Sequence, residues 1–289
     1  MKILSYLRDN KPALAASLGN EWFDITHRVG GDTPVRDVAE LLQIPSWEDR
    51  VRRATDGAQT IDADLVSLLP PIRHGEKILC VGLNYLAHTA ESPYPQPDYP
   101  TFFARFASTL IAHDQHIVRP KVSHELDFEG ELVAVIGTEG RHIPAEKALD
   151  YVAGYTIFNE ASVRNYQFKA PQWTMGKNFD DTGACGPWFV SADELPRGGA
   201  GLQLSTKVNG IVEQDANTDD MVFDVATLIS LASQVMTLRP GDMIVSGTPA
   251  GVRFGRKPPS YLVAGDICEI TIQGIGTLRN TVRDEEETA

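Results

Sequence analysis

Acidic residues alternate along one short segment, and carboxylates at this spacing are candidate ligands for a divalent cation. Asp127, Glu129 and Glu131 occupy every second position, and Val133 and Val135 continue the alternation. In a strand these five side chains share one face, so the acids lie at the edge of an apolar core. A cation would relieve their mutual repulsion, and Mg²⁺ and Ca²⁺ prefer oxygen ligands. A charged, solvent-facing edge strand is the alternative interpretation.

A further acid follows a second apolar segment. The run from Tyr151 to Phe158 is apolar and ends in Asn159 and Glu160. The exposed end of a buried strand is a usual place for a binding or catalytic residue. Glu160 therefore favours a metal site over an edge strand.

His88 and Glu91 form a candidate acid–base pair. The two residues are three positions apart, so in a helical turn they share a face and can hydrogen bond. A carboxylate beside an imidazole raises its basicity, and such an imidazole can deprotonate water. An exposed surface pair remains the alternative for this spacing.

Several other kinds of chemistry find no support in the sequence. It contains no G-x-G-x-x-G, Walker A, G-x-S-x-G or H-E-x-x-H motif. The formal net charge of -13, without a basic run, argues against nucleic acid and anionic membranes as partners. Three separated cysteines predict reduced thiols and a cytoplasmic location. No apolar stretch approaches the ~18 residues of a membrane span, and the early charges do not suit a signal peptide.

The pattern beyond residue 76 is mainly that of short strands. One helix is predicted from Val225 to about Thr237, where apolar residues recur at helical spacing. Many strands with few helices predict an α+β, β-rich fold, either a sandwich or a closed roll. The predicted strands include residues 78–81, 131–136, 151–158, 188–190, 204–208, 243–245 and 267–272.

Residues 1–70 differ in character and predict a small N-terminal accessory domain. Helices are expected over residues 35–42 and 47–54, and a hairpin turn at Gly19–Asn20. Pro70–Pro71 is the expected linker to a catalytic domain of residues 71–289. The acidic tail at residues 284–287 is expected to be solvated.

The proline-rich segment Ser92–Pro100 holds four prolines in nine residues and cannot be helical. It is interpreted as a lid or binding loop, or else as a stiff surface connection.

Four motifs together resemble the fumarylacetoacetate hydrolase (FAH) family, in particular bacterial members of acylpyruvase or 2-hydroxyhepta-2,4-diene-1,7-dioate isomerase type. The resemblance is ordered and extends from about Lys77 to Val282, and residues 1–70 are similar to an N-terminal extension of some members. The motifs are the family's E-x-E strand, the strand with its third acid, its lysine motif and its C-terminal substrate loop, here residues 127–137, 150–160, 173–180 and 241–252.

The resemblance implies an FAH-like mixed β-sandwich roll and a set of site residues. The implied metal ligands are Glu129, Glu131 and Glu160, holding Mg²⁺ or Mn²⁺, with Ca²⁺ as an alternative. The implied catalytic residues are His88, Glu91 and Lys177, and the implied substrate-binding residues are Arg105, Arg164, Gln167, Lys177 and Thr248. The chain departs from the family pattern at Glu160 and Asn165, where the family usually has aspartate.

The implied activity is hydrolysis of a carbon–carbon bond in a 2,4-dioxo acid of acylpyruvate or fumarylpyruvate type, giving pyruvate and a carboxylic acid. Isomerisation of a dienoate and decarboxylation of oxaloacetate are alternatives, since both also use an enolate that a metal stabilises. An inert small-acid binding protein is the alternative from another class. The resemblance also implies a homodimer.

Overall fold

One large sheet runs through the protein and carries the predicted acidic strands. The computed structural model describes residues 1–19 and 21–286, so the turn at Gly19–Asn20 and the tail at 284–287 lie partly outside the described residues. The sheet has eleven strands, with β7 (Leu110–Ile111) beside β13. The other strands, in spatial order, are β4 (Thr60–Ile61), β3 (Glu21–Asp24), β2 (Lys11–Leu18), β1 (Lys2–Arg8), β13 (Gly183–Ser191), β11 (Val152–Glu160), β10 (Gly130–Ile136), β16 (Met243–Val245), β5 (Ile78–Gly82) and β6 (Thr101–Arg105).

A second sheet packs against the middle of the first and encloses the main core. Leu132 of β10 belongs to the same buried cluster as Leu204 and Ile270 of the second sheet. This arrangement confirms the predicted β-rich α+β class. The second sheet consists of β15 (Ile211–Asn217), β14 (Gln203–Val208), β17 (Ile267–Ile272), β18 (Gly276–Asp284) and β8 (His116–Arg119), and a separate pair of short strands consists of β12 (Ser162–Val163) and β9 (Leu126–Asp127).

The helices are short, apart from the predicted helix α7 (Val225–Val235), whose first turn is capped by Asp224. The helix expected over residues 35–42 is only α1 (Val38–Leu41), because the Asp37 side chain accepts from the Ala39 amide and starts the helix there. No helix in the described part of the chain is both long and apolar enough to cross a membrane. The other helices are α2 (Trp47–Thr55), α3 (Leu86–Glu91), α4 (Ala145–Ala148), α5 (Arg164–Gln167) and α6 (Thr174–Lys177).

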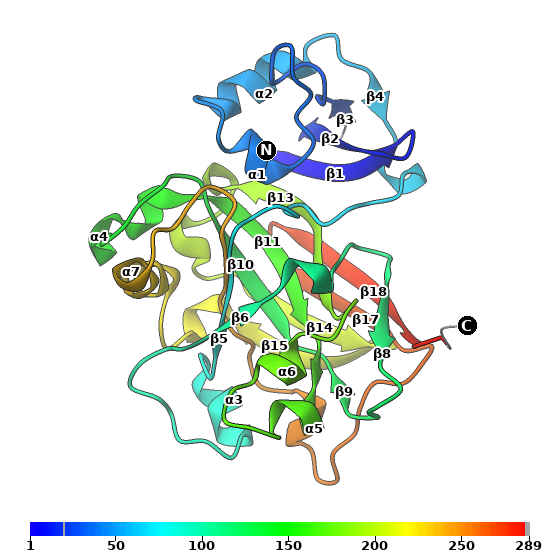
Figure 1. Ribbon diagram of the computed structural model, residues 1–289, viewed down its shortest axis with the longest axis vertical. Coiled ribbons are helices and arrows are strands. Elements are labelled where there is room, and N and C mark those ends of the chain that lie inside the picture. Colours follow the sequence, from blue (N-terminus) through cyan, green and yellow to red (C-terminus); the bar gives the residue numbers. More distant parts are fainter. Residues whose placement is uncertain (20, 287–289) are drawn as a thin grey trace.

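The N-terminal segment continues the large sheet. Strand β1 pairs antiparallel with β13, and Ile3 lies opposite Phe189. Ile3 and Leu14 share one buried cluster with Val133 and Phe158 of the central strands. Figure 1 shows this segment at one end of the molecule, with α3, α5 and α6 at the other. The two parts therefore share a sheet and a core, although the boundary at residue 70 stays a prediction.

Deleting residues 1–70 should leave the remainder aggregated or much less stable. The deletion uncovers the edge of β13 and the apolar face that includes Val133 and Phe158. Solubility and the midpoint of thermal unfolding measure the effect. A fragment of residues 71–289 that unfolds cooperatively at the parent's temperature would instead show two independent domains.

Candidate functional site

Three buried carboxylates converge where β10 and β11 lie side by side. The amide of Glu160 donates to the carbonyl of Glu129 at 2.9 Å, which joins the end of β11 to the start of β10. Glu131, two positions further, lies opposite Phe158 of β11. One oxygen from each of Glu129, Glu131 and Glu160 lies within 4.8 Å of the others. The structure therefore brings the three predicted ligands together.

Asp127 does not join this group. The prediction that one continuous strand carries all the acids is wrong at this residue. The chain leaves β9 after Asp127 and enters β10 at Gly130, so the alternation is interrupted. Asp127 Oδ2 accepts from Arg164 Nη2 at 2.9 Å and from the Phe254 amide at 2.9 Å. Asp127 therefore binds the neighbouring Arg164 and does not belong to the group of candidate metal ligands.

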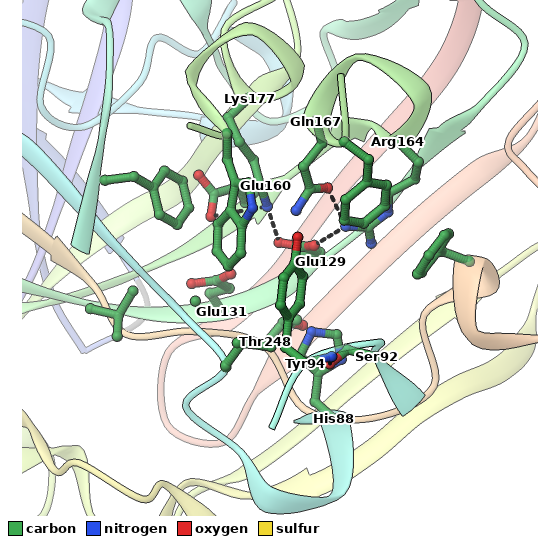
Figure 2. A pocket seen from close by; sticks show the side chains of 17 residues that line it. His88, Ser92, Tyr94, Glu129, Glu131, Glu160, Arg164, Gln167, Lys177 and Thr248 are labelled. Carbon is green, nitrogen blue, oxygen red and sulfur yellow. Dashed lines mark hydrogen bonds and ion pairs between the residues drawn. The ribbon is translucent and has the colours of Figure 1, made fainter. Parts of the chain in front are cut away.

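Two buried, positively charged side chains donate hydrogen bonds to Glu129. Arg164 Nη1 donates to Glu129 Oε1 at 2.5 Å, and Lys177 Nζ donates to Glu129 Oε2 at 2.6 Å. Figure 2 shows both side chains pointing at Glu129 from different sides. Lys177 Nζ also lies 3.7 Å from Glu160 Oε2. The short helices α5 and α6 supply these two cations, because Arg164 begins the first and Lys177 ends the second.

The acids fit a divalent cation. Burial, together with the charges of Glu160 and Glu129, raises the pKa of Glu131 well above its usual range. Glu160 Oε1 is buried and has no hydrogen-bond partner among the described residues. A cation held by oxygens of Glu129, Glu131 and Glu160 would resolve both conflicts. An all-oxygen donor set suits Mg²⁺, Mn²⁺ or Ca²⁺.

Glu160→Asp should retain metal binding, whereas Glu160→Ala should lose it. Aspartate keeps the charge but moves the carboxylate back by one CH₂, so we expect a changed preference between Mg²⁺ and Mn²⁺. Alanine removes the third donor. Calorimetric titration of the metal-free variants measures both effects. If Glu160→Ala bound Mn²⁺ as tightly as the parent, the third ligand would have to lie elsewhere.

His88 enters the same pocket from α3. Figure 2 shows His88 on the opposite side of the carboxylates from Lys177. Its Nδ1 atom is buried and has no hydrogen-bond partner in the described part of the chain. Burial lowers the pKa of His88 to about 4, and the positive charges of Arg164 and Lys177 act in the same direction. The imidazole is therefore neutral at pH 7 and able to accept a proton.

Glu91 does not hold His88 as predicted. Its Oε1 atom accepts from the Gly251 amide at 2.7 Å, and no hydrogen bond joins the two side chains within the described residues. Burial raises the pKa of Glu91. The spacing does place both residues on α3. The carboxylate of Glu91, however, is hydrogen bonded to the backbone of the loop after β16 that contains Gly251, here called the 250s loop. Glu91 therefore ties the helix to that loop.

The predicted substrate-binding residues divide into two groups. Gln167, Thr248, Arg164 and Lys177 all line the pocket. Thr248 donates from its hydroxyl to the Gly130 carbonyl at 3.0 Å.

Arg105, by contrast, is not a pocket-lining residue. It is fully buried behind Glu160, with Nη1 3.6 Å from Oε1 of that acid. Its Nη2 atom donates to Thr182 Oγ1 at 2.5 Å and to the Ala161 carbonyl at 3.3 Å. These partners hold the guanidinium against the third acid, outside the lining of the pocket.

Sequence reasoning missed the aromatic wall of the pocket. Its members come from separate segments, and single aromatic residues at irregular spacing give no periodic signal. The five residues are Tyr94, Phe103, Phe168, Trp173 and Phe254.

Comparisons with known proteins identify the family of the chain. Residues 77–283 match the family described as fumarylacetoacetate (FAA) hydrolase C-terminal. The chain is 42% identical over 221 residues to a mitochondrial oxaloacetate tautomerase of Xenopus laevis, covering 75% of this chain and 68% of that protein.

Two solved structures are similar over nearly the whole chain. The fumarylacetoacetate hydrolase from Exiguobacterium antarcticum has a TM-score of 0.85 at 32% identity, covering 99% of this chain and all of that one. The maleylpyruvate hydrolase of Sphingobium sp. SYK-6, in complex with manganese(II) and pyruvate, has a TM-score of 0.82 at 29% identity, with the same coverage. The chain belongs to the fumarylacetoacetate hydrolase family.

Proposed function

We propose that the protein is a divalent-metal-dependent enzyme that hydrolyses a carbon–carbon bond in a 2,4-dioxo acid. The observation that carries this proposal is the meeting of three converging carboxylates, Lys177 and a neutral His88 in one pocket. The relatives named above act on related small acids, as their names state.

The metal site supplies the electrophilic part of the chemistry. When bound by Glu129, Glu131 and Glu160, a divalent cation supplies Lewis acidity, which favours the enolate form of a 2-oxo acid. Lys177 lies beside Glu129 and Glu160 and adds a positive charge where the enolate oxygen develops.

His88 acts as the general base in this proposal. A water attacks the C4 carbonyl carbon while an imidazole nitrogen of His88 takes its proton. The C3–C4 bond then breaks, its electron pair passes to C3, and the acyl part leaves as a carboxylic acid. His88 releases its proton to solvent, and a proton from solvent adds to C3 and gives pyruvate. Glu91 keeps α3, and with it His88, against the 250s loop.

Keto–enol tautomerisation of a small 2-oxo diacid is the second candidate. The 42% identity to an oxaloacetate tautomerase favours it, as does the fact that no described carboxylate hydrogen bonds to His88. In this reaction His88 would move a proton at C3, and no water would be consumed.

One assay separates the candidates. Purified protein with Mn²⁺ is given an acylpyruvate and, separately, oxaloacetate. Pyruvate release is measured for the first, and the ultraviolet absorbance of the enol for the second. Hydrolysis predicts stoichiometric pyruvate that chelation abolishes. Enol conversion without pyruvate release would favour the tautomerase, and neither activity would indicate a binding protein.

A further inference from the structure

Five aromatic rings form a continuous arc around the outer part of the pocket. The ring centroids of Phe103 and Trp173 are 5.6 Å apart, and those of Trp173 and Tyr94 are 5.8 Å apart. The arc continues from Tyr94 to Phe168 at 6.4 Å and from Phe168 to Phe254 at 4.9 Å. Every link is within the range of favourable aromatic pairs.

The arc is buried at Trp173 and accessible at Tyr94 and Phe168. Trp173 is buried directly against Gly82 of β5, where a Cβ atom would approach its Cζ3 atom to 2.2 Å. Tyr94 and Phe168 retain more than a third of their exposure. A substrate that enters the pocket beside them would therefore contact aromatic rings.

The positively charged side chains of the pocket lie beside the acidic site. Lys177 and Arg164 are the lysine and arginine that line the pocket, and both are paired with Glu129. Lys177 Nζ lies 5.2 Å from the ring centroid of Phe103, and Arg164 Cζ lies 5.7 Å from that of Phe254. The two cations thus mark the boundary between the acidic site and the aromatic arc.

Suppose that the substrate carries a second carboxylate on its acyl group and that this group lies in the arc. Among the described lining residues, no lysine or arginine without an acidic partner would then be available to pair with it. Burying an unpaired charge is costly, whereas an apolar group gains contact with the rings. The charge distribution of the pocket therefore distinguishes two kinds of 2,4-dioxo acid. One carries a second carboxylate on its acyl group, and the other carries an uncharged acyl group.

We propose that the acyl group of the substrate is uncharged and apolar, and that an aryl ring suits it best, as in an aroylpyruvate. This inference rests on the proposed function, because it places the 2-oxo acid end at the three carboxylates. The aromatic arc then holds the acyl group. Tyr94 brings the segment Ser92–Pro100 into this wall, and the segment thereby contributes to acyl selection.

The test compares benzoylpyruvate with fumarylpyruvate on the metal-loaded protein. We expect kcat/KM for benzoylpyruvate to be higher by roughly 10-fold to 200-fold, the range that apolar pockets achieve. Dissociation constants of both acids, measured by calorimetry with Mn²⁺ present, should rank them in the same order. If fumarylpyruvate matched or exceeded benzoylpyruvate both in kcat/KM and in affinity, the inference would be overturned. The proposed hydrolase activity would still stand.

If neither acid is turned over, the proposed function fails, and the two dissociation constants still decide the question of the acyl group. Tighter binding of benzoylpyruvate would support the aromatic arc as an apolar binding site. Tighter binding of fumarylpyruvate would overturn it.

Phe168→Arg supplies a second test by introducing a cation into the arc. The ratio of kcat/KM for the two acids should move toward fumarylpyruvate by about 10-fold or more. Phe106→Arg is the matched control, because Phe106 is an exposed phenylalanine outside the pocket lining. An unchanged ratio in Phe168→Arg, with folding verified by circular dichroism, would contradict the proposal.

Discussion

Glu131→Gln is expected to lower the affinity for Mn²⁺ by at least roughly 100-fold, since loss of a supporting residue alone commonly costs 10-fold to 100-fold. Activity should fall with it. Glutamine has the same shape but lacks the charge, and one oxygen of Glu131 lies within 4.8 Å of ligand oxygens of both Glu129 and Glu160. Calorimetric titration of the metal-free variant measures the loss.

The same variant should be more stable than the parent when metal is absent. Burial and the two neighbouring acids raise the pKa of Glu131 in the folded protein above its value in the unfolded chain. At pH 7 folding must therefore bury its charge or take up a proton, and glutamine removes that cost. The midpoint of thermal unfolding should rise without metal, and the further rise on adding Mn²⁺ should disappear.

Glu139→Gln is the matched control, because Glu139 is exposed and lies 3.3 Å from the exposed Arg239. It should leave both the Mn²⁺ affinity and the response to metal unchanged. Undiminished Mn²⁺ binding in Glu131→Gln and also in Glu129→Gln would remove the basis of the metal assignment.

His88→Ala should reduce the turnover number for cleavage by roughly 10²–10⁴, the usual contribution of a positioned general base. Metal affinity should stay unchanged because no ligand is altered, and KM should change little. Steady-state kinetics with an acylpyruvate, alongside Mn²⁺ titration, measures the two effects separately. Leu86→Ala, at an exposed position of the same helix, controls for disturbance of α3.

Glu91→Gln should cost less than His88→Ala. Glutamine retains an oxygen that can accept the Gly251 amide, so α3 stays attached to the 250s loop. Exchange of substrate C3 hydrogens in deuterium oxide adds a further distinction. The exchange should persist in His88→Ala if His88 serves the attacking water, and should disappear if His88 moves the C3 proton. Cleavage at the parent rate in His88→Ala would contradict the hydrolytic role.

Local patterns in the sequence indicate an acidic centre but not its members. Asp127, Glu129 and Glu131 alternate into an apolar strand, and Glu160 ends another. The resemblance to the family selects Glu129, Glu131 and Glu160 from these four acids. Antiparallel pairing of β10 with β11 then brings them together. The α+β class follows in the same way from short strands separated by turns.

Other features depend on contacts between distant segments and could not be predicted from local patterns. Asp127 has the right spacing, yet the interruption after β9 turns it to Arg164. Glu91 has the right offset from His88, yet the Gly251 amide, 160 positions further along the chain, takes its carboxylate. Arg105 ends β6 at the edge of the large sheet, yet its guanidinium lies 3.6 Å from Glu160 at the end of β11.

The aromatic arc, which contacts the substrate in this proposal, could not be predicted from local patterns either. Tyr94, Phe103, Phe168, Trp173 and Phe254 share no spacing, and only the fold places them around one pocket. Burial also sets the pKa of His88, which the two-residue motif alone cannot give.

Hydrogen exchange at C3 of pyruvate tests the central claim most directly, because hydrolysis, tautomerisation and isomerisation all pass through an enolate. Pyruvate is incubated with the parent protein in deuterium oxide, and loss of its methyl proton signal is followed by nuclear magnetic resonance. The account predicts exchange with Mg²⁺, chosen because it is diamagnetic, and none after chelation or in Glu131→Gln. An absence of exchange in the parent protein with Mg²⁺ demonstrably bound would contradict it.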